Sequence, residues 1–166
     1  MDLGLTGSVA LVTGGASGIG AAIAAGLAKE GCDIAVVDRV VNGGVAAIQL
    51  RVEAAGRRLR AIEADVRNFG AAEEAVKAAQ AEFGRLDILV NNAGTTKHVA
   101  HANLEGLTGD DFQRIYAVNV VGAFQMLRAA RELLERGAEA SGRASAVVMV
   151  SSIAGVDGTG SSIAYA

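Results

Sequence analysis

Two serine hydroxyls and a phenol lie near the end of the sequence, in SSIAGVDGTGSSIAYA. Ser151 and Ser152 come first, and a glycine-punctuated stretch leads from them to Tyr165. Hydroxyl groups of these kinds can polarise a carbonyl oxygen and transfer a proton to it. The three residues are therefore candidates for carbonyl or alcohol chemistry, although the serines could simply end a strand and the tyrosine could belong to the core.

A second stretch with a chemical use is TGGASGIG at residues 13–20, which follows an apolar run and precedes an alanine-rich one at 21–28. Its glycines, Gly14, Gly18 and Gly20, let the backbone turn sharply, approach a ligand closely and pack a helix tightly on a strand. A phosphate would bind the exposed amides where that helix begins. The turn lacks the lysine and hydroxyl residue that a P-loop requires, which disfavours a nucleotide triphosphatase.

Asp38 ends the second apolar run, 18 residues beyond Gly20. An acidic side chain at this distance from a glycine-rich turn hydrogen-bonds the ribose hydroxyls of a dinucleotide. The same carboxylate repels a 2′-phosphate, so it favours NAD over NADP, and Arg39 beside it would partly offset that repulsion. The alternative is an aspartate that only starts the following turn.

The elements that must position these residues are short apolar runs alternating with helical stretches. We expect strands at 9–12, 34–37, 59–62, 88–90 and 146–150. Helices are expected at 21–28, at 69–83, and from a capping box at Thr108 and Asp111 onward, with an apolar face through Phe112, Ile115, Met126 and Leu133. The alternation predicts an α/β fold, a doubly wound parallel sheet of Rossmann type in one dinucleotide-binding domain over 1–166.

Composition and charge exclude several classes of protein. The 166 residues are 51% hydrophobic with a formal charge of −3, which gives no basic surface for nucleic acid or an anionic membrane. No apolar stretch is long enough to span a bilayer, and Cys32 is the single cysteine. We expect a soluble cytoplasmic protein with a buried thiol and no metal site. His98 and His101 are expected in an exposed loop, and the alternative is that they face a substrate.

Taken together, four motifs are found in one family of enzymes. They are TGGASGIG, the NNAG of residues 91–94, Asn119 within a helix, and a serine at 152 that lies thirteen residues before Tyr165. On these motifs the sequence resembles the short-chain dehydrogenase/reductase family over its whole length.

The resemblance implies a role for each matching residue. The cofactor would contact Gly14, Ser17, Gly18, Ile19 and Gly20 with its pyrophosphate and ribose, Asp65 and Val66 with its adenine, and Asn92, Ala93 and Gly94 along its length. Asn91 would tie the sheet together. Ser152 would hydrogen-bond the substrate oxygen, Tyr165 would be the acid or base, and Asn119 would hold a water molecule in a proton relay.

The resemblance also implies a lysine four residues after Tyr165, at position 169, which would help to lower the pKa of the phenol. We therefore expect the sequence to be the N-terminal portion of a longer enzyme, with the fold truncated after the fifth strand and AVVMV left as an apolar edge. The full-length enzyme is expected to be a homo-oligomer, through the helix that holds Asn119 and another that begins near Tyr165.

The implied activity is hydride transfer between NAD(H) and an alcohol or carbonyl compound of unspecified identity. Two alternatives remain open. One is a non-catalytic or inactive dinucleotide-binding module. The other is a methyltransferase with a similar glycine-rich turn, which would explain neither NNAG nor the spacing from Ser152 to Tyr165.

Overall fold

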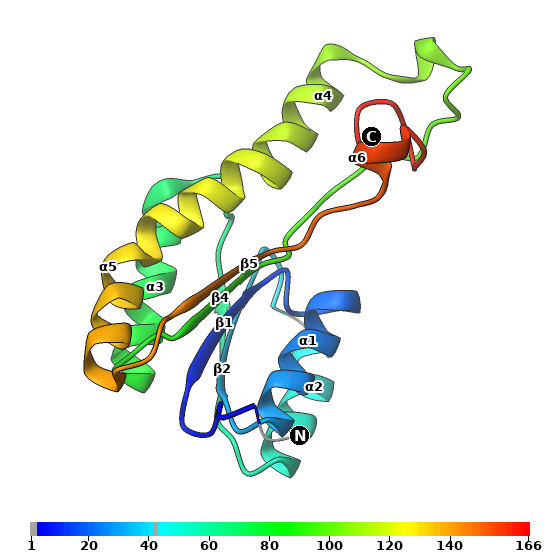
Figure 1. Ribbon diagram of the computed structural model, residues 1–166. Helices are drawn as coiled ribbons and strands as arrows, with labels where there is room; N and C mark the ends of the chain where they lie inside the picture. The colour runs from blue at the N-terminus through cyan, green and yellow to red at the C-terminus, as the bar shows by residue number, and fades with distance from the viewer. Residues whose placement is uncertain (1–2, 42) are drawn as a thin grey trace.

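A five-stranded parallel sheet lies between two layers of helices in the computed structural model, which describes residues 3–41 and 43–166 (Figure 1). The strand order is β3-β2-β1-β4-β5, and every neighbouring pair is parallel. The strands are β1 Val9–Thr13, β2 Asp33–Asp38, β3 Leu59–Glu63, β4 Ile88–Asn91 and β5 Ala146–Met149. The predicted doubly wound sheet of Rossmann type is confirmed.

Helices cover both faces of this sheet. The described ones are α1 Gly18–Lys29, α2 Gly43–Ala54, α3 Phe69–Phe83, α4 Gly109–Tyr116, α5 Ala123–Ser141 and α6 Ala154–Asp157, with a 3₁₀ turn η1 at Leu104–Gly106 and a π-helical segment η2 at Ala117–Gly122. The pair α1 and α2 lies on one face and the pair α3 and α5 on the other (Figure 1). None of the described helices is both long and apolar enough to cross a membrane.

Alternating residues of the strands fill two separate cores, because successive side chains of a strand point to opposite faces of the sheet. On β1, Val9 and Leu11 pack in one core with residues of α3 and α5. Ala10 and Val12 pack in the other core with residues of α1 and α2. The four side chains are at most 2% exposed, which explains why the sequence shows apolar runs without polar alternation.

Local sequence signals set the ends of several helices. Asn68 caps α3 by accepting a hydrogen bond from the amide of Ala71, and Gly84 ends that helix in the left-handed region. The predicted capping box of Thr108 and Asp111 starts α4. The predicted bounds of the helix at 69–83 are confirmed.

Two expectations about helices require correction. Helix α1 begins at Gly18 and not at residue 21, because the backbone is already helical after an extended Ser17. Phe112 was expected on a buried face, yet 45% of it is exposed, whereas Ile115 is buried. The reason is that α4 extends beyond the ends of the strands, where no sheet lies beneath it (Figure 1).

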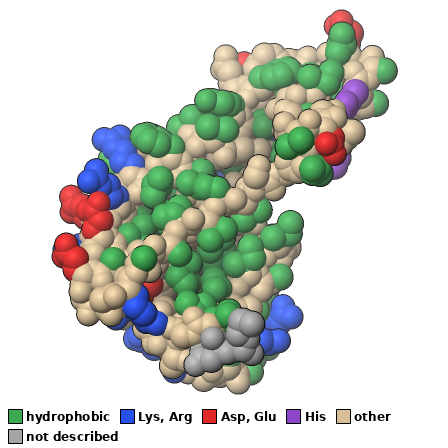
Figure 2. All heavy atoms as spheres, viewed as in Figure 1, with side chains coloured by type: hydrophobic (Ala, Val, Ile, Leu, Met, Phe, Trp, Pro, Cys, Tyr) green, Lys and Arg blue, Asp and Glu red, His purple; other side chains and the backbone are tan. Residues whose placement is uncertain are grey.

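Strand β5 is the edge of the sheet within the described residues, as expected. All four of its residues are exposed, with Val147 and Val148 at 42% and 46%. Figure 2 shows hydrophobic side chains gathered in the middle of this face, where β5 runs. One side of the structure therefore presents uncovered apolar surface.

Candidate functional site

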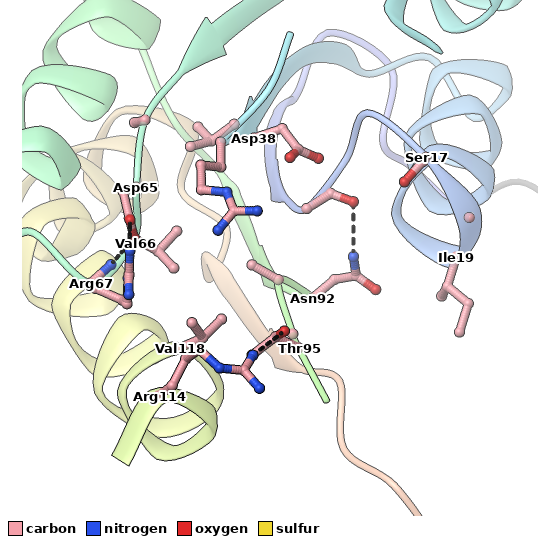
Figure 3. A pocket seen from close by; sticks show the side chains of 17 residues that line it. Ser17, Ile19, Asp38, Asp65, Val66, Arg67, Asn92, Thr95, Arg114 and Val118 are labelled. Atoms are coloured by element: carbon pink, nitrogen blue, oxygen red, sulfur yellow. Dashed lines mark hydrogen bonds and ion pairs between the residues drawn. The ribbon is translucent and has the colours of Figure 1, made fainter. Parts of the chain in front are cut away.

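A first cavity of about 380 Å³ lies at the carboxyl end of the sheet, where loops after β1, β2, β3 and β4 meet (Figure 3). Most of the predicted cofactor-binding residues line it, namely Gly14, Ser17, Gly18, Ile19, Asp38, Asp65, Val66, Asn92, Ala93 and Gly94. The carboxyl edge of a parallel sheet is where ligands bind in this class of fold, because the loops there diverge around an open crevice.

The glycine turn after β1 is shaped by close packing of its backbone. Gly14 has φ +63°, and a Cβ there would lie 2.8 Å from the Cα of Ala93. A Cβ on Gly20 would lie only 2.2 Å from the carbonyl oxygen of Gly14, so Gly20 is buried behind the turn and is not on the cavity wall. Gly18 has φ +52° and open space on its Cα. Two glycines thus permit packing, and Gly18 leaves room at the cavity.

Asn92 binds this turn to the end of β4. Its Nδ2 donates hydrogen bonds to the carbonyl oxygens of Thr13 (3.0 Å) and Gly14 (3.2 Å). The hydroxyl of Thr13 accepts from the amides of Asn92 and Ala93, both at 3.0 Å. The turn and the strand end therefore form one hydrogen-bonded unit.

Asp38 lines the cavity and also accepts hydrogen bonds from nearby backbone amides. Its Oδ2 accepts a hydrogen bond of 3.0 Å from the amide of Ala16, within the glycine turn. Its Oδ1 lies 3.5 Å from the amide of Val40. The turn-starting role weighed from the sequence is therefore present together with a position on the cavity wall.

Charged side chains complete the wall of the first cavity. Asp65 is paired with Arg67 at 2.5 Å, and hydrogen bonds from that guanidinium hold the pKa of Asp65 below its ordinary value. Arg39 and Arg114 also line the cavity. Arg114 donates to the hydroxyl of Thr95 at 3.2 Å, and Figure 3 shows the pair on the side opposite Asp38.

A second cavity of about 880 Å³ brings together the three predicted catalytic residues, Asn119, Ser152 and Tyr165. It shares part of its wall with the first cavity, namely Ile19, Asn92, Ala93, Gly94 and Thr95. The shared wall makes the two cavities neighbours along the end of β4.

Asn119 belongs to the π-helical segment η2, and such segments are frequent at functional sites. Its Oδ1 accepts from the amide of Thr95 at 2.8 Å, and its Nδ2 donates to the carbonyl oxygen of Thr95 at 3.1 Å. The side-chain amide thus has both partners that its position among apolar neighbours requires. Asn91 was expected to tie the sheet together, and its Nδ2 donates to the carbonyl oxygen of Ala123 in α5 at 3.2 Å and to the Sδ of Met149 in β5 at 3.3 Å.

Ser152 and Tyr165 reach the second cavity from the segment after β5. The hydroxyl of Ser152 accepts a hydrogen bond of 3.2 Å from the amide of Ala154. Both side chains are half-buried. Ser152 and Tyr165, which are thirteen residues apart, thus line the same cavity.

Several residues of the two cavities were not predicted as site residues. They are Val37, Arg39, Ala64, Arg67, Thr95, Arg114 and Val118 in the first cavity and Thr96 and Ser161 among those in the second. Arg114 and Val118 are four residues apart, a spacing that places both on one face of a helix. No charge pattern in the sequence identifies Arg114 as a site residue. Within 3–41 and 43–166, no three His, Cys, Asp or Glu side chains are placed to hold a metal ion.

Comparison with known proteins matches residues 8–166 to the short chain dehydrogenase family. The chain is 42% identical over 139 residues to D-threitol dehydrogenase of Mycolicibacterium smegmatis, covering 82% of this chain and 51% of that protein. It is 35% identical over 154 residues to L-rhamnose 1-dehydrogenase (NAD(P)(+)) of a Sphingomonas species, covering 93% and 58%.

Among solved structures, NADH-dependent reductase A1-R′ complexed with NAD superposes with a TM-score of 0.89 at 30% identity. The match covers 99% of this chain and 68% of that one. The chain therefore spans between half and two thirds of the length of these proteins. On the match to residues 8–166 and on the shared fold, the chain belongs to the short-chain dehydrogenase family.

Proposed function

We propose that the protein is an oxidoreductase that transfers a hydride between NAD(H) and an alcohol or carbonyl compound. The observation that carries this proposal is the shared wall of the two cavities. Asn119, Ser152 and Tyr165 line one cavity, the glycine turn and Asp38 line the other, and the end of β4 borders both. A dinucleotide in the first cavity would thus present its reactive end to a substrate in the second.

The first cavity fits a dinucleotide in three respects. The amides where α1 begins favour a pyrophosphate. The open space on Gly18 admits close approach of a ligand to the backbone. Asp38 offers a carboxylate to ribose hydroxyls and repels a 2′-phosphate, which supports NAD over NADP. When bound, the nicotinamide would accept or supply the hydride.

The chain supplies the proton chemistry in this proposal. During oxidation the carbinol carbon loses a hydride, and the hydroxyl proton passes to Tyr165, while Ser152 hydrogen-bonds the same oxygen. During reduction Tyr165 returns the proton to the oxygen. A free phenol has a pKa near 10, so poising it near pH 7 takes about 4 kcal/mol of stabilisation of the phenolate.

The matched relatives support alcohols and sugars as the substrate class, since one is named for D-threitol and another for L-rhamnose. We propose small neutral molecules as substrates and the cytoplasm as the location. We also propose a homo-oligomer for the full-length protein. Neither nucleic acid nor a membrane has a part in the proposed function.

The test is to measure both NADH binding and NADH oxidation with the purified full-length protein. We expect Tyr165→Phe to lower kcat about 10³-fold with a panel of carbonyl compounds, because the proton donor is lost. The dissociation constant of NADH should change less than about threefold, since the first cavity is intact. NADH binding without turnover of any carbonyl compound would instead indicate a non-catalytic dinucleotide-binding module.

A further inference from the structure

Three polar side chains of the second cavity have no part in the proposed hydride transfer. They are Thr96, His98 and Ser161, which we call the hydroxyl wall. Thr96 and His98 follow β4, whereas Ser161 lies in the segment after α6. A hydrogen bond of 2.8 Å from the amide of Val99 to the carbonyl oxygen of Ser161 joins the two segments.

The hydroxyl wall is held in place from both sides. The hydroxyls of Thr96 and Ser161 hydrogen-bond each other directly. The neighbouring Lys97 is paired with Asp111 of α4 at 2.7 Å, which anchors the first segment to a helix. Both hydroxyl residues are half-buried. Their groups therefore occupy fixed positions before any ligand binds, which lowers the entropic cost of binding.

The paired hydroxyls retain bonding capacity that a ligand could use. Each hydroxyl has one donor and two lone pairs, so the pair keeps one donor and several lone pairs after its own hydrogen bond. His98 is exposed and lines the same cavity, and the nitrogens of an imidazole ring can take part in hydrogen bonds. A ligand group that both donates and accepts suits such a wall, and that group is a hydroxyl.

The charge of the second cavity points to the same class of ligand. The described residues that line it include no lysine, arginine, aspartate or glutamate. A carboxylate or phosphate on the substrate would therefore find no fixed cation among these residues, whereas a neutral group needs none. The rest of the wall includes apolar Val120, Met149 and Val150, which suit a carbon skeleton.

We propose that Thr96, His98 and Ser161 bind a second hydroxyl group of the substrate, so that the preferred substrate is a neutral polyol or hydroxycarbonyl compound and not a simple alcohol or an acid. The inference rests on the proposed function, because it requires Ser152 and Tyr165 to hold the reacting oxygen. Specificity then comes from a hydroxyl that the reaction leaves unchanged.

The test compares matched alcohols that differ in their additional hydroxyl groups. The pairs are 2,3-butanediol with 2-butanol, cis-1,2-cyclohexanediol with cyclohexanol, and sorbitol with 2-hexanol. Each oxidation yields the carbonyl compound, NADH and a proton, so NADH formation by the full-length protein gives kcat/KM. We expect the hydroxyl-rich member of at least one pair to be preferred about tenfold or more. The simple alcohol lacks the second hydroxyl group and so leaves the polar groups of the hydroxyl wall without a partner.

The variant to test is Thr96→Val with Ser161→Ala, which removes both hydroxyls with little change of shape. It should lower the preference at least about fivefold and leave kcat/KM for the simple alcohol within about twofold. Thr159→Val is the matched control, because Thr159 is exposed in the same loop and lines neither cavity. Its preference should equal that of the unmodified protein.

An equal preference in the double variant and the unmodified protein would overturn this inference alone, as would simple alcohols that react as well as the hydroxyl-rich ones. A protein that forms NADH from none of the six alcohols would overturn the proposed function, and the inference that depends on it. The two failures are thus told apart by whether any alcohol reacts.

Discussion

The two cavities are neighbours, yet they are built in opposite ways. The first rests on β1 and β2, whose residues such as Val12 and Val36 are fully buried between two helix layers. The second is enclosed by the segments after β4 and β5, and β5 itself is exposed along its length. The first cavity is therefore positioned by strands of the buried core, whereas the second is formed by loops that meet outside the core.

The two cavities differ in which interactions determine their shape. In the first cavity, backbone geometry decides the shape, as at Gly14 and Gly20, where there is no room for a side chain. In the second, hydrogen bonds between segments distant in sequence hold the loops together, such as that from the amide of Val99 to the carbonyl oxygen of Ser161. We therefore expect changes in the first cavity to act through global stability, and changes in the second to act locally.

The largest expected effect is that of Gly20→Ala. Its Cβ would lie 2.2 Å from the carbonyl oxygen of Gly14 and 2.5 Å from the Nδ2 of Asn92, so the turn and the end of β4 would have to separate. We expect a loss of about 3 kcal/mol in the free energy of unfolding. Urea denaturation measures it.

Gly26→Ala is the matched control in the same helix. No atom lies within 4 Å of a Cβ at Gly26, and alanine favours a helix over glycine by about 1 kcal/mol. This variant should be as stable as the unmodified protein or slightly more so. Equal stability of Gly20→Ala and the unmodified protein would mean that close packing does not define the first cavity.

The same contrast explains what the sequence could predict. The apolar runs predicted β1, β2 and β4 because these strands are buried on both faces, and the apolar runs of β3 and β5 predicted strands that are partly or fully exposed. Asn68 and Gly84 marked the ends of α3 through a local hydrogen bond and a left-handed φ. The glycine turn and Asp38 could be placed in one site because each lies at the carboxyl end of a parallel strand. These features depend on residues that are close in sequence.

Other features depend on tertiary structure that no local pattern reveals. Thr96 and Ser161 are 65 residues apart, and only the folded chain brings them together. Phe112 is exposed because α4 extends beyond the sheet. The spacing of apolar residues could not reveal this, since a buried helix shows the same spacing. The sequence located Gly20 in the glycine turn. Only the folded backbone shows that it lies on the packed side of the turn and not on the cavity wall.

A smaller effect is expected from Asn119→Leu, in the wall of the second cavity. The amide and carbonyl oxygen of Thr95 would each lose a partner, at a cost of about 2 kcal/mol. If that wall is held locally, amide exchange should accelerate at residues 95–99 and stay unchanged in β1 and β2. Hydrogen-exchange mass spectrometry measures both.

Asn119→Asp provides the intermediate case for this comparison. Its carboxylate can still accept from the amide of Thr95 but cannot donate to the carbonyl oxygen, so exchange should lie between that of Asn119→Leu and that of the unmodified protein. Acceleration that spreads equally to β1 and β2 in either variant would show that the two cavities share one unit of stability.

The smallest effect concerns Cys32, which lies in the core on the α1 and α2 face, at the end of β2 opposite to the first cavity, and is 0% exposed. Burial, and next the nearby Asp87 carboxylate, raise the pKa of the Cys32 thiol from 9.0 to about 11. Between these values the thiol ionises in the unfolded chain and stays protonated in the folded one. The unfolded state then binds fewer protons, so stability falls as the pH rises through this window and is unaffected well below it.

Urea denaturation measures this effect. Between pH 9 and pH 10 the free energy of unfolding should fall by about 1 kcal/mol more in the unmodified protein than in Cys32→Ala. Parallel curves would mean that water reaches the thiol, and that the core on the α1 and α2 face of the sheet is no more closed than the loops around the second cavity.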